Sequence, residues 1–339
     1  MITSRHVAES AGVSVSTVSL VLSDRWQERR ISVSARDRVL AAAKKLNYQP
    51  NQLARGLKMG RTNTVVLATL DKLYHPYVHQ RIEAIRVALQ RSGYRMLLEV
   101  FDDVNEAGRW LPHNTGSICD GVILLGADPG ELTSLVKQCP KGLPLVVSGS
   151  PVSKAVSSVT YDRAEVVRLS VDHLARQGCE RIAMIYDQID NEVSRERLLG
   201  YKEALKRAQL PFNQDLLIRS RVDAETGQQI AEKVLKAAAP PAGVFCYNNE
   251  IALRLVHAFL QKGLRVPEDI AVVAHGDTRL NLLCEVPLSG VSTNEDEIAK
   301  AIVKTIFKQI GTPKCPPEQV TVTPFLVPRA SSLLRKVAN

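Results

Sequence analysis

Basic residues are concentrated at one end of this 339-residue chain. Residues 1–61 hold 11 Lys and Arg against 4 Asp and Glu, a net charge of +7, whereas the rest of the chain carries only +2. A small basic segment on a nearly neutral remainder is typical of nucleic-acid binding, because Lys and Arg neutralise phosphates. An acidic membrane surface is the rival partner, and simple solubilisation also remains open.

The basic segment has the pattern of a helix-turn-helix. Thr3 and Ser4 can cap a first helix that ends at Gly12, and Ser14 offers a second N-cap two residues later. A third amphipathic helix is expected over about residues 34–46. Two short helices joined by a glycine-containing turn are typical of the DNA-binding motif whose second helix enters the major groove.

A shorter basic element follows at about residues 51–58. Asn51 can cap a helix of barely two turns, which should be frayed unless a partner orders it. Arg55 and Lys58 suit phosphate neutralisation, and Leu57 suits an apolar wedge in the minor groove. A flexible linker to the next domain is the alternative interpretation.

From residue 64 onward, apolar runs rich in Val, Ile and Leu alternate with amphipathic stretches. Seven runs, from TVVLATL to IAVVAHG, read as buried strands, and helices are expected over 76–92, 163–177, 194–208 and 224–238. This alternation indicates an α/β fold of parallel sheets covered on both faces. About 275 residues of this pattern exceed one sheet, so we expect two lobes with a ligand cleft between them.

Polar and aromatic side chains follow several of the predicted strands. Aromatic faces and planar donors and acceptors suit a small polyol, although each residue can equally serve as a helix cap, as Asn248 and Asn249 would before residues 250–261. The strand-end candidates are Asp71, Tyr74, His75, Tyr77, Gly126, Asp128, Ser148, Asp187, Asn248, Asn249, His275, Gly276 and Asp277.

Signatures of other protein classes are missing from the sequence. There is no G-x-G-x-x-G or G-x-x-x-x-G-K-[ST] loop, no H-E-x-x-H and no G-x-S-x-G, which argues against an enzyme. The six cysteines form no CxxC pair, and His75 and His79 are better explained as a surface pair, so we expect neither metal nor cofactor. Without a signal-peptide core or a membrane-length apolar run, we expect a cytoplasmic protein.

Four stretches of the sequence resemble the LacI/GalR (lactose-repressor) family of bacterial transcription regulators. They are GVSVSTVS, NYQPNQLARGLKMGRTNTVVL, RLLGY and LRVPEDIAVV, and they occur in the family's order along the chain. The resemblance implies a three-helix helix-turn-helix head with a hinge helix, followed by a two-lobed, periplasmic-binding-protein-like core. The implied boundaries are 1–61 for the head, with the hinge helix at about 51–58, and 62–339 for the core. Lobe 1 is then about 62–161 and 291–322, and lobe 2 about 162–290 and 323–332.

The same resemblance assigns DNA contacts to residues of the head. It places Val15, Ser16 and Leu20 at base edges, Thr17, Ser19, Tyr48 and Asn51 near phosphates, and Leu57 at the minor-groove wedge. Many family members carry Arg or another polar residue where this chain has Leu20, which offers only apolar contact. The loop 23–31 looks longer than usual, and we hypothesise that Arg29 and Arg30 add contacts there.

In the core, the resemblance places Arg197 and Asn249 at effector-binding positions and Asp162 in a recurrent Asp-Asn pair. At Gly276, sugar-binding members generally carry an aspartate that grips hydroxyls. A neutral hexose is therefore a less secure expectation than family membership suggests, and an acidic or phosphorylated metabolite competes with it.

The expected function is a sequence-specific DNA-binding regulator, a repressor, that binds a palindromic operator in double-stranded DNA as a homodimer. A small metabolite (a sugar, sugar acid or phosphorylated sugar) bound between the lobes would modulate its operator affinity. The alternative is a cytoplasmic solute-binding receptor without direct DNA function. Only LLRKVAN follows Ser332, too short for a coiled-coil series, which favours a dimer over a tail-assembled tetramer.

Overall fold

The computed structural model describes residues 2–48, 61–73, 75–126, 128–186, 192–220, 225–237, 242–312 and 314–334. The chain separates into two compact units, Met1–Asn63 and Thr64–Asn339, which we call the head and the core. Within the described ranges, no helix is both long enough and apolar enough to cross a membrane.

The head consists of three α-helices and one short 3-10 helix. They are α1 (Ser4–Ala11), α2 (Val15–Leu22), η1 (Gln27–Arg29) and α3 (Val33–Lys45). Gly12 ends α1 with a left-handed φ of 62°, and the Ser14 side chain accepts a hydrogen bond from the Thr17 backbone at 3.1 Å. Val7, Val18 and Val39 form the centre of the head's own hydrophobic core. The predicted helix-turn-helix and both of its cap positions are confirmed.

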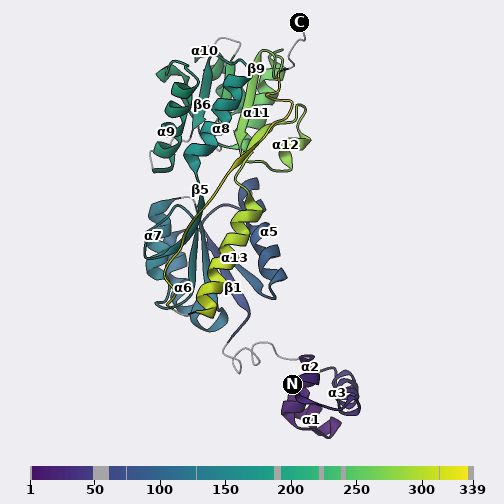
Figure 1. Cartoon of the computed structure of the whole chain (residues 1–339). Helices are drawn as coiled ribbons and strands as arrows, with labels where there is room; N and C mark the ends of the chain where they lie inside the picture. Colours follow the sequence, from purple (N-terminus) through teal and green to yellow (C-terminus); the bar gives the residue numbers. More distant parts are fainter. Residues whose placement is uncertain are drawn as a thin grey trace. The chain divides into compact units, whose positions relative to one another are not determined.

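The first lobe of the core is a parallel sheet with helices on both faces (Figure 1). Its strand order is β11-β5-β4-β3-β1-β2. Helices α5 and α13 pack on one face, and α6 and α7 on the other. The elements of lobe 1 are β1 (Thr64–Thr69), α5 (Pro76–Arg91), β2 (Arg95–Val100), α6 (Val104–Ile118), β3 (Gly121–Gly126), α7 (Pro129–Gln138), β4 (Leu145–Gly149), β5 (Ser157–Tyr161), α13 (Glu295–Gly311) and β11 (Gln319–Val322).

The second lobe repeats this architecture with the order β12-β10-β9-β8-β6-β7, in which only β12 runs antiparallel to its neighbour. Helices α8 and α9 cover one face of the sheet, and α10 and α11 cover the other. The elements of lobe 2 are α8 (Arg163–Arg176), β6 (Ile182–Tyr186), α9 (Glu192–Arg207), η2 (Gln214–Leu216), β7 (Leu217–Arg219), α10 (Gly227–Ala237), β8 (Ala242–Cys246), α11 (Asn249–Gln261), β9 (Ile270–His275), α12 (Leu280–Leu283), β10 (Ser289–Ser292) and β12 (Phe325–Val327).

The chain passes between the two lobes three times: after β5, between β10 and α13, and between β11 and β12 (Figure 1). The α/β fold of two parallel-sheet lobes is confirmed, and all seven predicted strands are present. Five further strands, β5, β7, β10, β11 and β12, were not expected, because each is only three to five residues long and several are polar.

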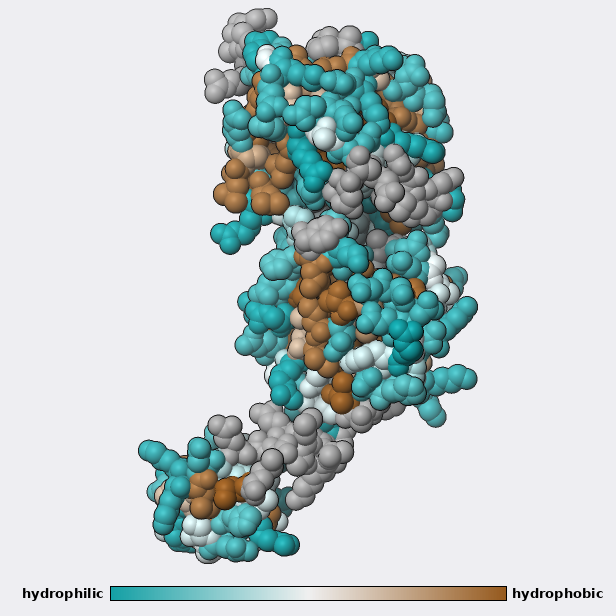
Figure 2. Space-filling view, turned by 180° about the vertical axis from the view of Figure 1, so that it is seen from behind, coloured by the Kyte–Doolittle hydropathy of each residue, from teal (hydrophilic) through white to brown (hydrophobic). Residues whose placement is uncertain are grey.

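Figure 2 shows hydrophobic side chains gathered on the surface of both lobes amid a largely hydrophilic surround. In lobe 2, the most exposed large hydrophobic residues lie on α12, where Leu282 is 60% and Leu283 is 77% exposed. Leu280, on the same helix, is 38% exposed. Apolar side chains this exposed are candidates for contact with a protein partner.

Candidate functional site

Helix α2 presents an outer face of small side chains. Val18 and Val21 turn into the head core, whereas Ser16 and Ser19 are exposed and Val15 is 39% exposed. The two remaining candidates on this helix, Thr17 and Leu20, are half-buried. Short side chains on the second helix of a helix-turn-helix allow its backbone to approach a DNA groove closely.

The loop after α2 is fastened to the head by Trp26. The Trp26 ring packs against the head core, and the Arg36 guanidinium lies 4.9 Å from its centroid. Arg29 and Arg30 are exposed on this loop, so their charges face solvent. Tyr48 is half-buried against the same core. The other candidates in this region lie outside the described residues: Asn51, Arg55, Leu57 and Lys58.

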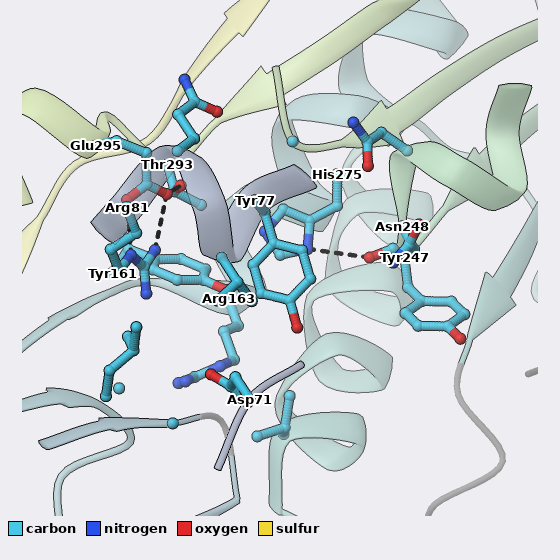
Figure 3. Close-up of a pocket in the computed structure, with 18 of the residues that line it drawn as sticks. Asp71, Tyr77, Arg81, Tyr161, Arg163, Tyr247, Asn248, His275, Thr293 and Glu295 are labelled. Atoms are coloured by element: carbon cyan, nitrogen blue, oxygen red, sulfur yellow. Dashed lines mark hydrogen bonds and ion pairs between the residues drawn. The ribbon is translucent and has the colours of Figure 1, made fainter. Parts of the chain in front are cut away.

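In the core, a cavity of about 340 Å³ lies between the strand ends of the two lobes (Figure 3). Its lining combines tyrosines and His275 with charged groups from both lobes. The strand-end and family candidates that line it are Asp71, Tyr77, Gly126, Asp128, Arg197, Asn248, Asn249, His275, Gly276 and Asp277. Lining residues that sequence reasoning missed include Arg81, Glu131, Tyr161, Arg163, Tyr247, Thr293 and Glu295.

Three candidates lie beside the cavity without lining it. His75 precedes α5 and stacks on Tyr77 with ring centroids 5.8 Å apart. Ser148 is fully buried in β4, and the Asp162 side chain caps α8 by accepting a hydrogen bond from the Glu165 backbone at 2.9 Å. Tyr74 and Asp187 lie outside the described residues.

Tyr161 is the centre of an aromatic and cationic cluster on the cavity wall. The guanidinium of Arg81 lies 5.6 Å from its ring centroid, and that of Arg163 lies 5.2 Å from it. The His275 ring is 5.5 Å away and faces the Tyr247 carbonyl oxygen with Nδ1 at 3.2 Å. Burial, followed by the charge of Arg197, holds the pKa of His275 well below its usual value, so this ring is neutral at pH 7.

Three of the charged lining residues, Arg81, Glu295 and Asp277, have strong partners within the protein. Arg81 and Glu295 form a bidentate ion pair, with Nε–Oε2 at 2.6 Å and Nη2–Oε1 at 2.8 Å. Burial opposes the charge of Arg81, but Glu295 outweighs it and raises the pKa of the guanidinium. Asp277 is paired with Arg329, with Oδ1 and Nη1 2.7 Å apart.

Three carboxyl groups of lobe 1 line the cavity: Asp71 after β1, Asp128 after β3, and Glu131 in the first turn of α7. The pKa of Asp71 is raised to about 6. Burial is the largest cause, the charge of Arg81 opposes it, and the charge of Glu131 adds to it. Burial and the charge of Asp128 also raise the pKa of Glu131. Asp128 caps α7 by accepting a hydrogen bond from the Glu131 backbone at 2.9 Å. These carboxyl groups therefore crowd one another and can accept several hydrogen bonds from ligand hydroxyls.

Two asparagines that line the cavity also stabilise lobe 2. Asn248 caps α11 by accepting a hydrogen bond from the Glu250 backbone at 2.7 Å, as expected of a helix cap. The Asn249 amide donates to Thr278 Oγ1 at 2.8 Å and is 2% exposed. Across the described ranges, no group of His, Cys, Asp or Glu is arranged to hold a metal ion.

Two parts of the chain match known protein families. Residues 3–51 match the bacterial regulatory proteins of the lacI family, and residues 171–332 match the periplasmic binding protein-like domain. The first match covers the helix-turn-helix, and the second covers most of lobe 2 and the returns of the chain through lobe 1.

Relatives with assigned names are similar over nearly the whole chain. The ribose operon repressor of Escherichia coli is 28% identical over 335 residues, covering 98% of this chain and 100% of the relative. The HTH-type transcriptional repressor PurR of Aliivibrio salmonicida is 26% identical over 314 residues, covering 91% and 92%. Both relatives are named as transcriptional repressors rather than as enzymes, in agreement with the expectation from the sequence.

Solved structures share the complete architecture. A complex of the transcriptional regulator CelR with cellobiose is 28% identical, covers 98% of this chain and 100% of its own, and has a TM-score of 0.70. A lac repressor dimer bound to operator has a TM-score of 0.82 at 24% identity, covering 98% and 99%, and shows the shared fold. With its helix-turn-helix head and two-lobed core, the chain belongs to the LacI family of bacterial transcription regulators.

Proposed function

We propose that the protein is a repressor that binds a palindromic operator as a homodimer and changes its operator affinity when a small polar metabolite occupies the core cavity. One observation carries this proposal: a basic helix-turn-helix and a polar cavity between two lobes occur on the same chain. We infer a cytoplasmic location, because a regulator of this kind works at the chromosome.

The head supplies the DNA contacts of this proposal. Its net charge of +7 favours phosphate binding, and the exposed small residues of α2 suit a major groove. In this proposal Val15, Ser16 and Leu20 contact bases, and Leu57 enters the minor groove. The proposed phosphate contacts are Thr17, Ser19, Arg29, Arg30, Tyr48, Asn51, Arg55 and Lys58.

The core supplies the response to the metabolite. Asp71 and Tyr77 belong to lobe 1, whereas Arg197 and His275 belong to lobe 2, so one ligand can contact both lobes. A ligand that binds one arrangement of the lobes more tightly shifts the equilibrium towards it, typically by about 1–3 kcal/mol of coupling. The relative in complex with cellobiose supports a polyhydroxylated ligand class.

The protein binds as a homodimer in this proposal, because a two-fold protein matches a palindromic site. The exposed leucines of α12 are the proposed dimer contact, since a partner subunit would cover them. We expect Leu282→Glu combined with Leu283→Glu to shift the full chain from dimer to monomer in light scattering after size-exclusion chromatography. If the double variant remained a dimer, α12 would not be the dimer interface.

The function is tested by selecting duplexes from a random DNA pool with the full chain, with and without a metabolite mixture. We expect a palindromic sequence to be enriched, with affinity that falls steeply as salt rises. The variant Val15→Glu, Ser16→Glu keeps the fold, because both side chains are exposed, but repels DNA. Enrichment of no sequence, or equal binding by this variant, contradicts the proposal and favours a solute receptor without DNA function.

A further inference from the structure

The charges that line the core cavity are segregated by sign. The lining contains five carboxyl groups and three guanidinium groups, and two of the carboxylates form ion pairs with arginines of the protein. Glu295 is bound by Arg81 at 2.6 and 2.8 Å, and Asp277 lies 2.7 Å from Arg329. The other three carboxyl groups, Asp71, Asp128 and Glu131, all belong to lobe 1, at the ends of β1 and β3 and the start of α7. The two guanidinium groups outside the Arg81 pair, those of Arg163 and Arg197, both belong to lobe 2.

The lobe 2 side of the cavity contains Arg163 and Arg197, at the start of α8 and in α9. The Arg163 side chain is only 5% exposed, and its one hydrogen bond within the described protein goes to Glu196 at 3.3 Å. Glu196 is itself 43% exposed, so solvent screens this contact. Arg197 lies over the Tyr247 ring with its guanidinium 5.6 Å from the centroid. The charges of both residues act on His275 of β9, as does the charge of Arg81 from lobe 1.

The aromatic ring of Tyr77 lies between the acidic and basic sides. Its hydroxyl experiences the charge of Asp71 as well as those of Arg81 and Arg197. Tyr77, His275, Asp71 and Tyr161 all line this cavity (Figure 3). A hydroxylated sugar ring seated here can place its C–H face against these aromatic rings, and it meets opposite charges at its two ends.

We propose that the cavity binds a sugar acid, whose carboxylate lies between Arg163 and Arg197 and whose hydroxyl groups donate to Asp71, Asp128 and Glu131. This inference rests on the proposed function in one respect, that the cavity is the effector site. A carboxylate accepts two parallel N–H bonds from a guanidinium fork, which makes arginine the best residue for this group.

The chemistry of the two sides sets the ligand's orientation. An anionic group placed at the lobe 1 end would meet carboxylates, whereas hydroxyl groups there find acceptors. A carboxylate at the lobe 2 end balances the guanidinium charges, and that of Arg163 belongs to a side chain only 5% exposed. A volume of about 340 Å³ is at the lower end of the range for small-molecule sites and admits a sugar of one or two rings.

The test is calorimetric titration of the full chain with sugars that differ at one group. Galacturonate and glucuronate carry a carboxylate, galactose and glucose are their neutral parents, galactosamine and glucosamine carry an ammonium group, and glucose 6-phosphate carries a phosphate. Galactonate and gluconate provide open-chain carboxylates. We expect at least one carboxylate sugar to bind ten or more times more tightly than its neutral parent.

Variants of Arg163 assign the carboxylate to its proposed site. Arg163→Gln should weaken binding of the carboxylate sugar about 10- to 100-fold while leaving the neutral parent unchanged. Arg163→Lys, which keeps the charge without the fork, should lose less. Arg168→Gln is the matched control, because Arg168 lies on the same helix and pairs with Glu165 and Asp172 away from the cavity. It should bind like the unaltered protein, and circular dichroism melts establish that each variant is folded.

Tighter binding of the neutral, phosphorylated or amino sugars than of every carboxylate sugar overturns the inference, as does equal loss of all ligands in Arg163→Gln. These outcomes are independent of operator selection. Enrichment of an operator without binding of any carboxylate sugar contradicts the sugar-acid ligand but supports the DNA-binding regulator. Binding of a carboxylate sugar without enrichment of any operator contradicts the regulator but supports the ligand.

Discussion

Arg81 and Glu295 form a two-point ion pair that joins α5 to α13 at the cavity, although the two residues are 214 positions apart in the chain. The side chains are only 10% and 7% exposed, and the Thr293 hydroxyl also donates to the carboxylate. Charge separation this deep is costly unless both partners are present. The pair therefore fixes the register of α13 against α5.

Removing one member of this pair should destabilise lobe 1 strongly. We expect Glu295→Gln to lower the free energy of unfolding by about 3–5 kcal/mol, because it leaves the Arg81 charge buried without its partner. The double variant Arg81→Leu, Glu295→Leu should lose much less. Urea titrations followed by circular dichroism measure both. A double variant as unstable as the single one would contradict the ion-pair explanation.

Asp71→Asn should stabilise the core at pH 7. Burial raises the pKa of Asp71 from 3.8 to about 6, so the folded state disfavours its charged form. The unaltered protein therefore loses stability as pH rises from near 3.8 to about 6, and the penalty persists above that. The amide removes the penalty, which is on the order of 1–3 kcal/mol.

Thermal melts between pH 4 and 8, roughly the range of this titration, measure that difference. Asp102→Asn is the control, because the Asp102 side chain is 96% exposed and should change neither stability nor its pH dependence. If Asp71→Asn and the unaltered protein kept parallel pH profiles, Asp71 would not be the titrating group.

Gly200→Ala should separate α9 from α8. A Cβ at Gly200 would lie 2.5 Å from the Ala164 carbonyl oxygen and 2.7 Å from the Ala164 Cα, and neither backbone atom can move without shifting its helix. We expect a loss of about 1–3 kcal/mol of stability. Ligand affinity should fall too, because Arg163 and Arg197 lie on these two helices.

The matched control is Gly108→Ala in α6. The nearest atoms to a Cβ at Gly108 belong to the flexible Gln138 side chain at 3.0 Å, so alanine should be tolerated there and should favour the helix. Equal melting temperatures for the two alanine variants would show that α8 and α9 are not closely packed at Gly200.

Ser14→Ala should weaken the head alone. Ser14 caps α2 by accepting a hydrogen bond from the Thr17 backbone at 3.1 Å, and losing such a cap costs about 1 kcal/mol. The chain has two tryptophans, Trp26 in the head and Trp110 in the core. In a Trp110→Phe background, Trp26 fluorescence reports unfolding of the head selectively.

The exposed residue Ser10 provides the comparison for this cap. Ser10→Ala lies within α1 and should change the head's stability by less than about 0.5 kcal/mol. Ser14→Ala should also reduce DNA affinity, because a frayed α2 must be ordered before it binds. A cap variant that melts like Ser10→Ala would leave Ser14 without the role assigned to it.

The parts of the fold that could be predicted are those with strong local signals. Gly12 and Ser14 mark the turn of the helix-turn-helix by their backbone preferences, and long apolar runs mark the central strands. Strands such as β10 and β11 escaped prediction, because SGVS and QVTV are too short and polar to show a period. They exist because neighbouring strands pair with them.

The lining of the cavity was predicted only in part, because some lining residues have a local sequence signal and others do not. Strand-end reasoning selects residues such as Asp71 and His275 correctly for the lining, but it selects Ser148 in place of Gly149, because alternate residues of a strand point to opposite faces. The family resemblance selects Asp162, whereas the next residue, Arg163, lines the cavity. Arg81 carries no local signal at all, since its partner lies on a distant helix.

The three passages of the chain between the lobes have a consequence for biosynthesis. Strand β11 closes the edge of the first sheet beside β5, yet the ribosome makes it after every parallel strand of the second. Lobe 1 therefore lacks α13 and this edge strand until the parallel strands of lobe 2 have been made, whereas the hydrophobic core of the head contains only residues of the head. A chain that stops before Gln319 would therefore still contain every residue of the head's hydrophobic core, but the first sheet would lack its edge strand β11.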